Sequence, residues 1–294
     1  MPAGREITIV EVGPRDGLQN ENGVISTHDK VELIRLLAGA GLARIEATAF
    51  VSPKWVPQMA DHDAVMRHAV RRDGLRLSAL VPNEKGALAA IAAGAQELAV
   101  FASASETFAM KNTNCTIAES IERFAPVLAL ARDNGLPVRG YVSCAVDCPY
   151  EGAIAPAAVA SVSERLANIG CAEIAVADTI GRAAPERVDD MLRAVLDIMP
   201  VERLACHFHD TSSMALANVD VALDHGIRVF DSAAGGLGGC PYAPGAAGNL
   251  ATGRLARHLS SLDYQHRIDL CLLDHAEQFA RKLSAHAKRS PKFV

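Results

Sequence analysis

Eight short β-rich runs, separated by longer Ala- and Leu-rich amphipathic segments, predict that this chain of 294 residues folds as a (β/α)8 or TIM barrel. Hydrophobic residues make up 50% of the sequence and charged residues 21%, so the chain can bury a large core without disulfides. No linker rich in Ser, Pro or Gly divides it, and we therefore expect a single domain over residues 1–294. A doubly wound open sheet is the alternative fold.

The strands are expected where short runs of apolar and β-branched residues lie between turn residues. In chain order they are Ile7–Val12, Arg44–Ala49, Leu75–Val81, Glu97–Ala102, Val138–Ser143, Glu173–Ala177, Leu204–His209 and Val229–Ser232.

Helices are expected between these strands, where the apolar residues recur with helical periodicity. The clearest are Thr27–Ala40, Lys85–Ala93, Ile117–Asn134, Pro156–Ile169 and Pro185–Met199. Ser26 or Thr27 is expected to cap the first helix, and a glycine closes several units, at Gly41, Gly94, Gly135, Gly170 and Gly226. Further helical sequence, from about Leu262 onward, predicts extra C-terminal helices outside the eight units.

The composition excludes several classes of partner. A net charge of −5 gives no reason to expect nucleic acid binding, and the basic pair Lys288-Arg289 is too short to form a patch. No run reaches the roughly 18 apolar residues of a membrane helix. We expect a homo-oligomer, a dimer or larger.

The 7 cysteines are scattered and odd in number, which does not suggest a disulfide framework. The chain also begins without a secretory signal pattern, so we expect a cytoplasmic protein. Cys144 and Cys148 have zinc-like spacing, but no second pair at finger spacing follows, and a structural zinc site is not expected.

The expected seventh strand ends in His207-Phe208-His209, and this pair is the first candidate for chemistry. In a strand, residues i and i+2 point to the same face, so both imidazoles would reach one point in space. A metal site is one interpretation of the pair. Taken alone, such a pair is more often two hydrogen-bonded histidines.

Barrel active sites lie at the carboxyl ends of the strands, and polar residues gather there in this sequence. Arg15-Asp16 follows the first strand, Glu46 lies in the second, and a Gly-rich loop with Cys240 and Asn249 follows the eighth. Ser143-Cys144 and Asp178-Thr179 end two further strands.

Each of these features also has a purely structural interpretation. Arg15-Asp16 can be an ion pair, a Gly-rich loop can be a tight connection, and Cys240 can be an inert small hydrophobe. Together, however, an Asp, two His and an Asn on one face favour a divalent metal such as Mg²⁺ or Mn²⁺ with open positions for substrate.

Several motifs resemble the 3-hydroxy-3-methylglutaryl-CoA lyase family. They are Glu11–Glu21 (EVGPRDGLQNE), Phe50–Met59 (FVSPKWVPQM), Gly140–Cys144 (GYVSC), Cys148–Gly152 (CPYEG), Asp178–Gly181 (DTIG) and Gly236–Tyr242 (GLGGCPY). The resemblance runs from about Ile7 to about Gly253. The last motif distinguishes this family from the related isopropylmalate and homocitrate synthases.

The resemblance implies a metal-dependent retro-Claisen cleavage of 3-hydroxy-3-methylglutaryl-CoA to acetyl-CoA and acetoacetate, in leucine degradation and ketone body formation. It implies four metal ligands, Asp16, His207, His209 and Asn249. Arg15 would stabilise the enolate, Cys240 would protonate it, and Glu46 would support proton handling. Asp16 and His207 are the nearest candidates for taking up the hydroxyl proton, and the substrate is an acyl-CoA.

The sequence departs from the family pattern beside the expected site. Ala49 stands where Ser is common, Ser212-Ser213-Met214 stands where a larger residue followed by Gly is usual, and Gly253 stands where some members carry an acid. A lyase, aldolase or condensing enzyme acting on another 3-hydroxy-acyl-CoA or on a 2-oxo acid is therefore an alternative. A non-catalytic barrel that binds CoA esters is the alternative from another class.

Overall fold

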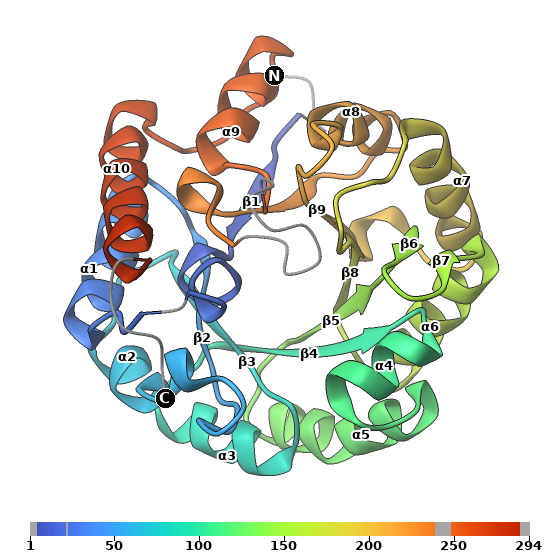
Figure 1. Ribbon diagram of the computed structural model, residues 1–294, viewed down its shortest axis with the longest axis horizontal. Helices are drawn as coiled ribbons and strands as arrows, with labels where there is room; N and C mark the ends of the chain where they lie inside the picture. Colours follow the sequence, from blue (N-terminus) through green and yellow to red (C-terminus); the bar gives the residue numbers. More distant parts are fainter. Residues whose placement is uncertain (1–4, 22, 239–247, 289–294) are drawn as a thin grey trace.

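Eight parallel strands close into a barrel in the computed structural model, which describes residues 5–21, 23–238 and 248–288. The strand order is β1-β10-β9-β8-β5-β4-β3-β2, and β1 pairs with both β10 and β2 (Figure 1). The predicted (β/α)8 barrel is confirmed. The open sheet is excluded, because the first strand pairs with the last.

Each of the eight predicted strands is present, with bounds that differ from the prediction by one residue at most. The barrel strands are β1 (Thr8–Glu11), β2 (Arg44–Ala49), β3 (Arg76–Leu80), β4 (Glu97–Ser103), β5 (Val138–Ser143), β8 (Glu173–Asp178), β9 (Leu204–Phe208) and β10 (Val229–Ser232). A small antiparallel hairpin of β6 (Asp147–Cys148) and β7 (Gly152–Ala153) was not predicted, because two-residue strands leave no periodic pattern.

The five predicted helices are α1 (Thr27–Gly39), α3 (Glu84–Ala92), α5 (Ile117–Asp133), α6 (Pro156–Asn168) and α7 (Pro185–Leu196). Ser26 caps α1, where its side chain accepts a hydrogen bond from the Asp29 N–H. The prediction for α7 was too long at its C-terminal end. Met199 precedes Pro200, and a residue before proline disfavours helical geometry.

All five glycines expected after these units have positive φ, between 67° and 111°. The remaining helical elements are α2 (His62–His68), α4 (Glu106–Thr113), α8 (Ala215–Asp224), α9 (Thr252–Ser261) and α10 (Leu270–Ala287), with the short turns η1 (Gly13–Gly17), η2 (Pro57–Met59), η3 (Val201–Arg203) and η4 (Ala234–Gly236). Helix α10 packs against α1 and η4, so the C-terminal part of the chain lies beside its beginning (Figure 1).

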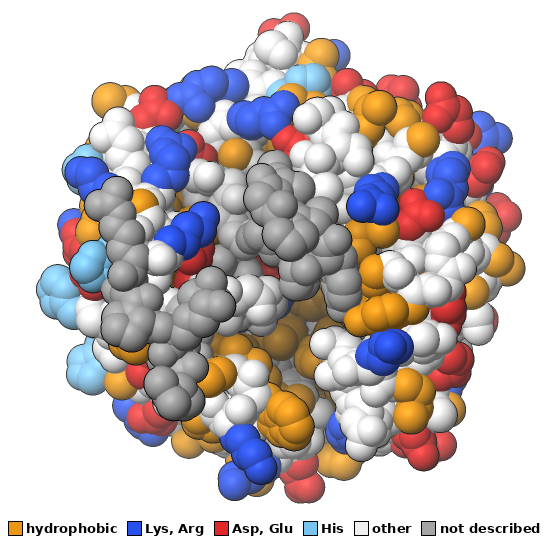
Figure 2. Space-filling view, in the orientation of Figure 1, with side chains coloured by type: hydrophobic (Ala, Val, Ile, Leu, Met, Phe, Trp, Pro, Cys, Tyr) orange, Lys and Arg blue, Asp and Glu red, His pale blue; other side chains and the backbone are white. Residues whose placement is uncertain are grey.

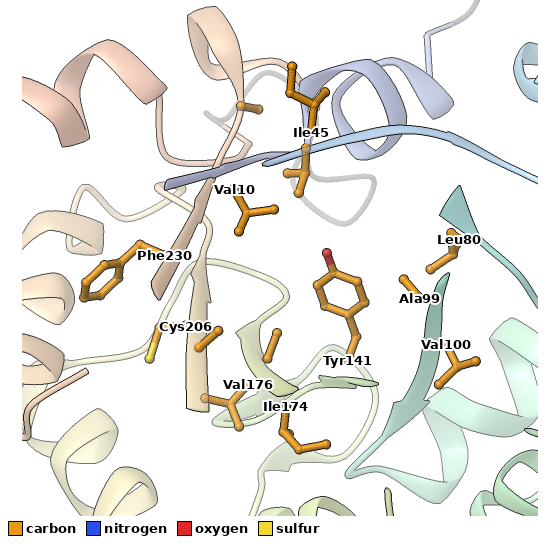
Figure 3. Packing of buried hydrophobic residues seen from close by; sticks show 14 of the residues in the cluster. Val10, Ile45, Leu80, Ala99, Val100, Tyr141, Ile174, Val176, Cys206 and Phe230 are labelled. Atoms are coloured by element: carbon orange, nitrogen blue, oxygen red, sulfur yellow. The ribbon is translucent and has the colours of Figure 1, made fainter. Parts of the chain in front are cut away.

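The hydrophobic core draws on every barrel strand. The residues labelled in Figure 3 come from all eight strands, and Tyr141 of β5 lies among them. Most of the buried apolar side chains form one large cluster, whose burial is the main source of the barrel's stability. Within the described residues, no helix is both long and apolar enough to cross a membrane.

Candidate metal centre and active site

Three candidate metal ligands lie together at the carboxyl ends of β1 and β9. One ligand atom each from Asp16, His207 and His209 can be chosen so that all lie within 4.8 Å of one another. The two imidazole centroids are 5.2 Å apart, as the spacing of one residue predicts. His207 lies in β9, and His209 follows the last residue of that strand.

A tight turn after β1 presents Arg15 and Asp16 to this point. The carbonyl of Val12 accepts hydrogen bonds from the N–H groups of Arg15 (3.2 Å), Asp16 (2.7 Å) and Gly17 (3.2 Å), which folds η1 back on itself. A Cβ at Gly17 would lie 2.7 Å from the Cβ of Leu237, so only glycine allows η1 to approach the chain that follows β10 so closely.

A hydrogen bond in one case and burial in the other leave both histidines suited to bind a metal ion. The Nδ1–H of His207 donates to Oδ2 of Asp231 at 3.0 Å, which leaves its Nε2 lone pair free. In His209, the buried Nδ1 has no hydrogen-bond partner among the described residues. Burial, and after it the neighbouring His207, lowers the pKa of His209 to about 4, so at neutral pH this imidazole is in the neutral form that binds metals.

Asp16 and Asn249 add oxygen donors to the cluster. Burial alone would raise the pKa of Asp16, but the Arg15 guanidinium, the two histidines and the hydrogen bond from Asn249 together outweigh it and lower the pKa to about 2, so the carboxylate is ionised. Nδ2 of Asn249 donates to Asp16 Oδ2 (2.8 Å) and to the Leu237 carbonyl (3.0 Å). The buried Oδ1 of Asn249 accepts no hydrogen bond from the described residues, so it is available to a cation.

Arg15 is held rigidly beside these ligands. Its Nε lies 2.5 Å from Oε2 of Glu46 and its Nη1 lies 2.8 Å from Oδ1 of Asp16, while its guanidinium faces the Tyr141 ring at 5.7 Å. The ion pair allowed by the structural interpretation of Arg15-Asp16 is therefore present. Burial raises the pKa of Glu46 and would lower that of Arg15, but Glu46 and Asp16 keep the guanidinium protonated.

The polar residues at the ends of the other strands do not belong to the ligand cluster but make hydrogen bonds that hold the loops. Asp178 accepts hydrogen bonds from the N–H groups of Gly181 and Ala183, both at 3.0 Å, and so holds its own loop. The N–H of Cys144 donates to Thr179 Oγ1 at 2.8 Å. These groups fit the structural interpretation. Cys240 lies outside the described residues.

Sequence reasoning missed the charged residues inside the barrel that support His207. Asp231 is fully buried, and its Oδ1 lies 2.7 Å from Nη2 of Arg139. Nε of Arg139 lies 2.7 Å from Glu173, and Arg44 lies 2.9 Å from both Glu173 and Glu97. A charged residue inside a short, mostly uncharged predicted strand was the available signal for Arg139 and Asp231.

One departure from the family pattern has a visible backbone consequence. Ser213 has φ of 61°, the left-handed region that favours glycine, at the position where the resemblance leads one to expect Gly. Holding a serine there costs about 1 kcal/mol. The change lies in the loop after His209 and leaves the ligand cluster intact.

The surface above the barrel is open to a ligand. Figure 2 shows a hollow near the middle of one face, with hydrophobic side chains on its visible floor. A small pocket between the carboxyl ends of β4 and β5 and helix α4 is lined by residues that include Phe101, Phe108, Asn112 and Ser143. Fold, hollow and ligand cluster together define a TIM-barrel enzyme with a candidate divalent metal centre at the usual end of the barrel.

Comparison with known proteins narrows this class. The sequence profile described as HMGL-like matches residues 6–280. The hydroxymethylglutaryl-CoA lyase of Pseudomonas mevalonii is 53% identical over 264 residues, which cover 90% of this chain and 88% of that protein. The chain therefore belongs to the hydroxymethylglutaryl-CoA lyase family.

Solved structures agree with this assignment. The crystal structure of the HMG-CoA lyase from Brucella melitensis is 54% identical in sequence, with a TM-score of 0.94 over 95% of this chain and 99% of that chain. An HMG-CoA lyase from Acinetobacter baumannii, solved in complex with coenzyme A and 3-methylmalate, is 36% identical, with a TM-score of 0.92 over 99% of this chain and 94% of that chain.

Proposed function

We propose that this protein cleaves 3-hydroxy-3-methylglutaryl-CoA into acetyl-CoA and acetoacetate with the help of a divalent metal ion. The observation that carries the proposal is the buried cluster of Asp16, His207, His209 and Asn249 with Arg15 fixed beside it, in a chain of this family. Support for an acyl-CoA substrate comes from the relative that was solved with coenzyme A.

The chemistry makes three demands on the site. The C3 hydroxyl must lose its proton, the C2–C3 bond must break, and the electron pair must pass to the thioester as an enolate. Protonation of that enolate at C2 gives acetyl-CoA, while C3 becomes the ketone of acetoacetate. Each demand requires a group at a fixed position.

Asp16, His207, His209 and Asn249 would hold the metal ion through carboxylate, imidazole and amide donors. This mixed oxygen and nitrogen set suits Mg²⁺ or Mn²⁺. When bound, the ion supplies Lewis acidity that lowers the pKa of the substrate hydroxyl.

Asp16 is the better candidate to receive the hydroxyl proton. If His207 binds the ion through Nε2 while its Nδ1–H donates to Asp231, no lone pair is left on that ring to accept a proton. Asp16 is ionised, and its oxygens, which accept hydrogen bonds from Arg15, Gln19 and Asn249, are the acceptors that could take up the proton. Glu46 would act through Arg15, because its carboxylate fixes the position of the guanidinium.

Arg15 would stabilise the enolate oxygen. Within the described residues its hydrogen bonds use Nε and Nη1, which leaves Nη2 free for the developing negative charge. Because the guanidinium is already oriented, it needs no reorganisation as the charge appears. Cys240 is proposed as the acid that protonates C2.

The direct test is to incubate the purified protein with 3-hydroxy-3-methylglutaryl-CoA and Mg²⁺ or Mn²⁺ and to measure acetoacetate, with EDTA as the control. Formation that depends on metal is the expected result. Other 3-hydroxy-acyl-CoA esters, and acetyl-CoA together with 2-oxo acids, should be assayed in parallel because of the changes at Ala49, Ser212 and Ser213. Faster turnover of one of these would replace the proposed substrate.

The wider biological setting belongs to the same proposal. The six cysteines in the described part of the chain are free, as expected for a cytoplasmic protein. We propose that the barrel and its C-terminal helix form one catalytic domain, which assembles as a dimer or larger and serves leucine degradation and ketone body formation. Light scattering after size-exclusion chromatography tests the assembly.

A further inference from the structure

The chain on either side of the proposed ligand Asn249 forms two stems that run side by side. The first stem is residues 233–237 and the second is residues 249–253. Ala233 and Ala251 form a parallel bridge, the Ala233 N–H donates to the Leu250 carbonyl at 3.0 Å, and the Thr252 N–H donates to the Ala233 carbonyl at 3.2 Å. A shift of one stem is therefore passed to the other.

A carboxylate on a distant helix joins both stems. Oε1 of Glu277, in the middle of α10, accepts hydrogen bonds from the N–H of Gly235 on the first stem (3.0 Å) and from the N–H of Gly253 on the second (2.8 Å). Glu277 is only 5% exposed to solvent. A buried carboxylate that accepts two backbone N–H groups is a strong clamp, because the charge strengthens both hydrogen bonds.

A second carboxylate holds the neighbouring positions. The buried Glu11, at the end of β1, accepts hydrogen bonds from the Ala234 N–H (2.9 Å) and from the Thr252 hydroxyl (2.7 Å). Glu11 and Glu277 thus join consecutive pairs of residues, 234 with 252 and 235 with 253. The first tie fixes the stems to the barrel, and the second fixes them to the C-terminal helix.

The lack of a side chain at position 253 leaves the space that the carboxylate of Glu277 occupies. A Cβ there would lie 2.9 Å and 3.0 Å from the two oxygens of Glu277 and 2.8 Å from Nη1 of Arg257, so a side chain at 253 would displace the ends of these two side chains. Gly253 is also the second residue of α9, where an N–H group points out of the helix and favours an anion. At the position where some members of the family carry an acid, this chain has a glycine that is contacted by a carboxylate from α10.

The stems determine where Asn249 points. Its side-chain Nδ2 donates to the carbonyl of Leu237, on the first stem, while its backbone lies in the second stem and is bridged to His209. The direction of the free Oδ1 therefore depends on the spacing of the two stems as well as on the hydrogen bond from Nδ2 to Asp16.

We infer that Glu277 is a positioning residue for the metal centre, which fixes Asn249 Oδ1 by clamping Gly235 and Gly253. The inference rests on the metal site of the proposed function but not on the substrate. Loss of the clamp should weaken metal binding by about tenfold or more, as is typical when a group supporting a metal ligand is removed.

The test is Mn²⁺ binding, followed by electron paramagnetic resonance, with the full-length chain and its Glu277→Ala and Glu277→Gln variants. Glu277→Gln keeps the side-chain shape and one acceptor oxygen, so it should lose less affinity than Glu277→Ala. Glu122→Gln, at an exposed position of α5, makes the same charge change away from the site and should bind Mn²⁺ like the parent chain.

A second experiment supplies the carboxylate from position 253 instead of position 277. Gly253→Glu alone should bind Mn²⁺ poorly, because its side chain would overlap Glu277. In the Glu277→Ala/Gly253→Glu double variant the new side chain enters the vacated space beside Arg257, and Mn²⁺ affinity should recover at least in part.

Unchanged Mn²⁺ affinity in a folded Glu277→Ala variant would overturn the inference, as would a drop in melting temperature without any change in affinity. If the parent chain binds Mn²⁺ but does not cleave 3-hydroxy-3-methylglutaryl-CoA, the substrate assignment fails while the role of Glu277 is still tested by binding.

Discussion

Replacing Asp231 by Asn should weaken the metal centre without touching a proposed ligand. Asp231 is fully buried between the Nδ1–H of His207 (3.0 Å) and the guanidinium of Arg139 (2.7 Å), and both neighbours are hydrogen-bond donors. A carboxylate accepts from both. An Asn side chain must turn its NH₂ group toward one of them, so one donor always faces another donor.

The loss of metal affinity depends on whether His207 or Arg139 loses its hydrogen-bond acceptor at position 231. The single amide oxygen of Asn can accept from only one of the two donors, and the charged guanidinium of Arg139 competes for it better than His207, which is uncharged when it binds a metal. Without its acceptor, His207 loses the tautomer that frees Nε2. Groups of this kind change metal affinity by about 10- to 100-fold, which corresponds to about 1.4–2.8 kcal/mol.

Isothermal titration with Mn²⁺ measures the affinity, and circular dichroism checks the fold. Asp220→Asn is a matched control, because Asp220 pairs with His258 at 2.6 Å on the surface, where the same substitution should leave Mn²⁺ binding unchanged. An Asp231→Asn variant that is folded and binds Mn²⁺ within about twofold of the parent chain would refute the reasoning.

Four further predictions concern the site and its support. His209→Ala should abolish most Mn²⁺ binding and activity, with partial rescue at high Mn²⁺ concentration. A Mn²⁺ titration curve identical to that of the parent chain would show that His209 is not a ligand. Arg15→Lys should lower kcat by about 100-fold while KM stays nearly constant, since a clamp on the enolate acts in the transition state; a rise in KM alone would make Arg15 a substrate-binding group. Cys240→Ser should reduce turnover steeply with metal binding intact, and Cys240 should be the cysteine that substrate protects from alkylation, as peptide mapping can show. Burial raises the pKa of Glu11 from 4.5 to about 7, so between these two pH values the folded state holds a proton that the unfolded state has released. The free energy of unfolding should therefore fall by up to about 3 kcal/mol as the pH rises from about 4.5 to 7. Glu11→Gln should remove this slope from thermal unfolding curves, and an identical slope in the variant would contradict the assignment.

The sequence by itself was enough to predict the barrel and the positions of its strands and helices along the chain. Strands such as Arg44–Ala49 and Val138–Ser143 were predicted at their observed bounds, because each is a short run rich in apolar and β-branched residues that lies between turn residues. Glycines such as Gly41 and Gly170 were recognisable as helix ends, because only glycine adopts their positive φ at no steric cost.

The sequence also named the four residues proposed as metal ligands. His207 and His209 could be paired from their spacing alone, since the period of a strand is two residues. Asp16 and Asn249 lie far apart in the chain, yet the fold prediction placed both at the carboxyl ends of barrel strands, where they meet at 2.8 Å.

Only the tertiary structure decided how these ligands are supported. That Asp231 orients His207, and that Glu277 joins Gly235 to Gly253, depends on side-chain directions and on the packing of α10. Neither partnership leaves a periodic signal, because the partners lie 24 to 42 residues apart and their contact arises when the barrel closes and the last helix packs against it. Local patterns specify elements and the end of the barrel where they converge, whereas the buried hydrogen bonds that fix each ligand are set by long-range packing.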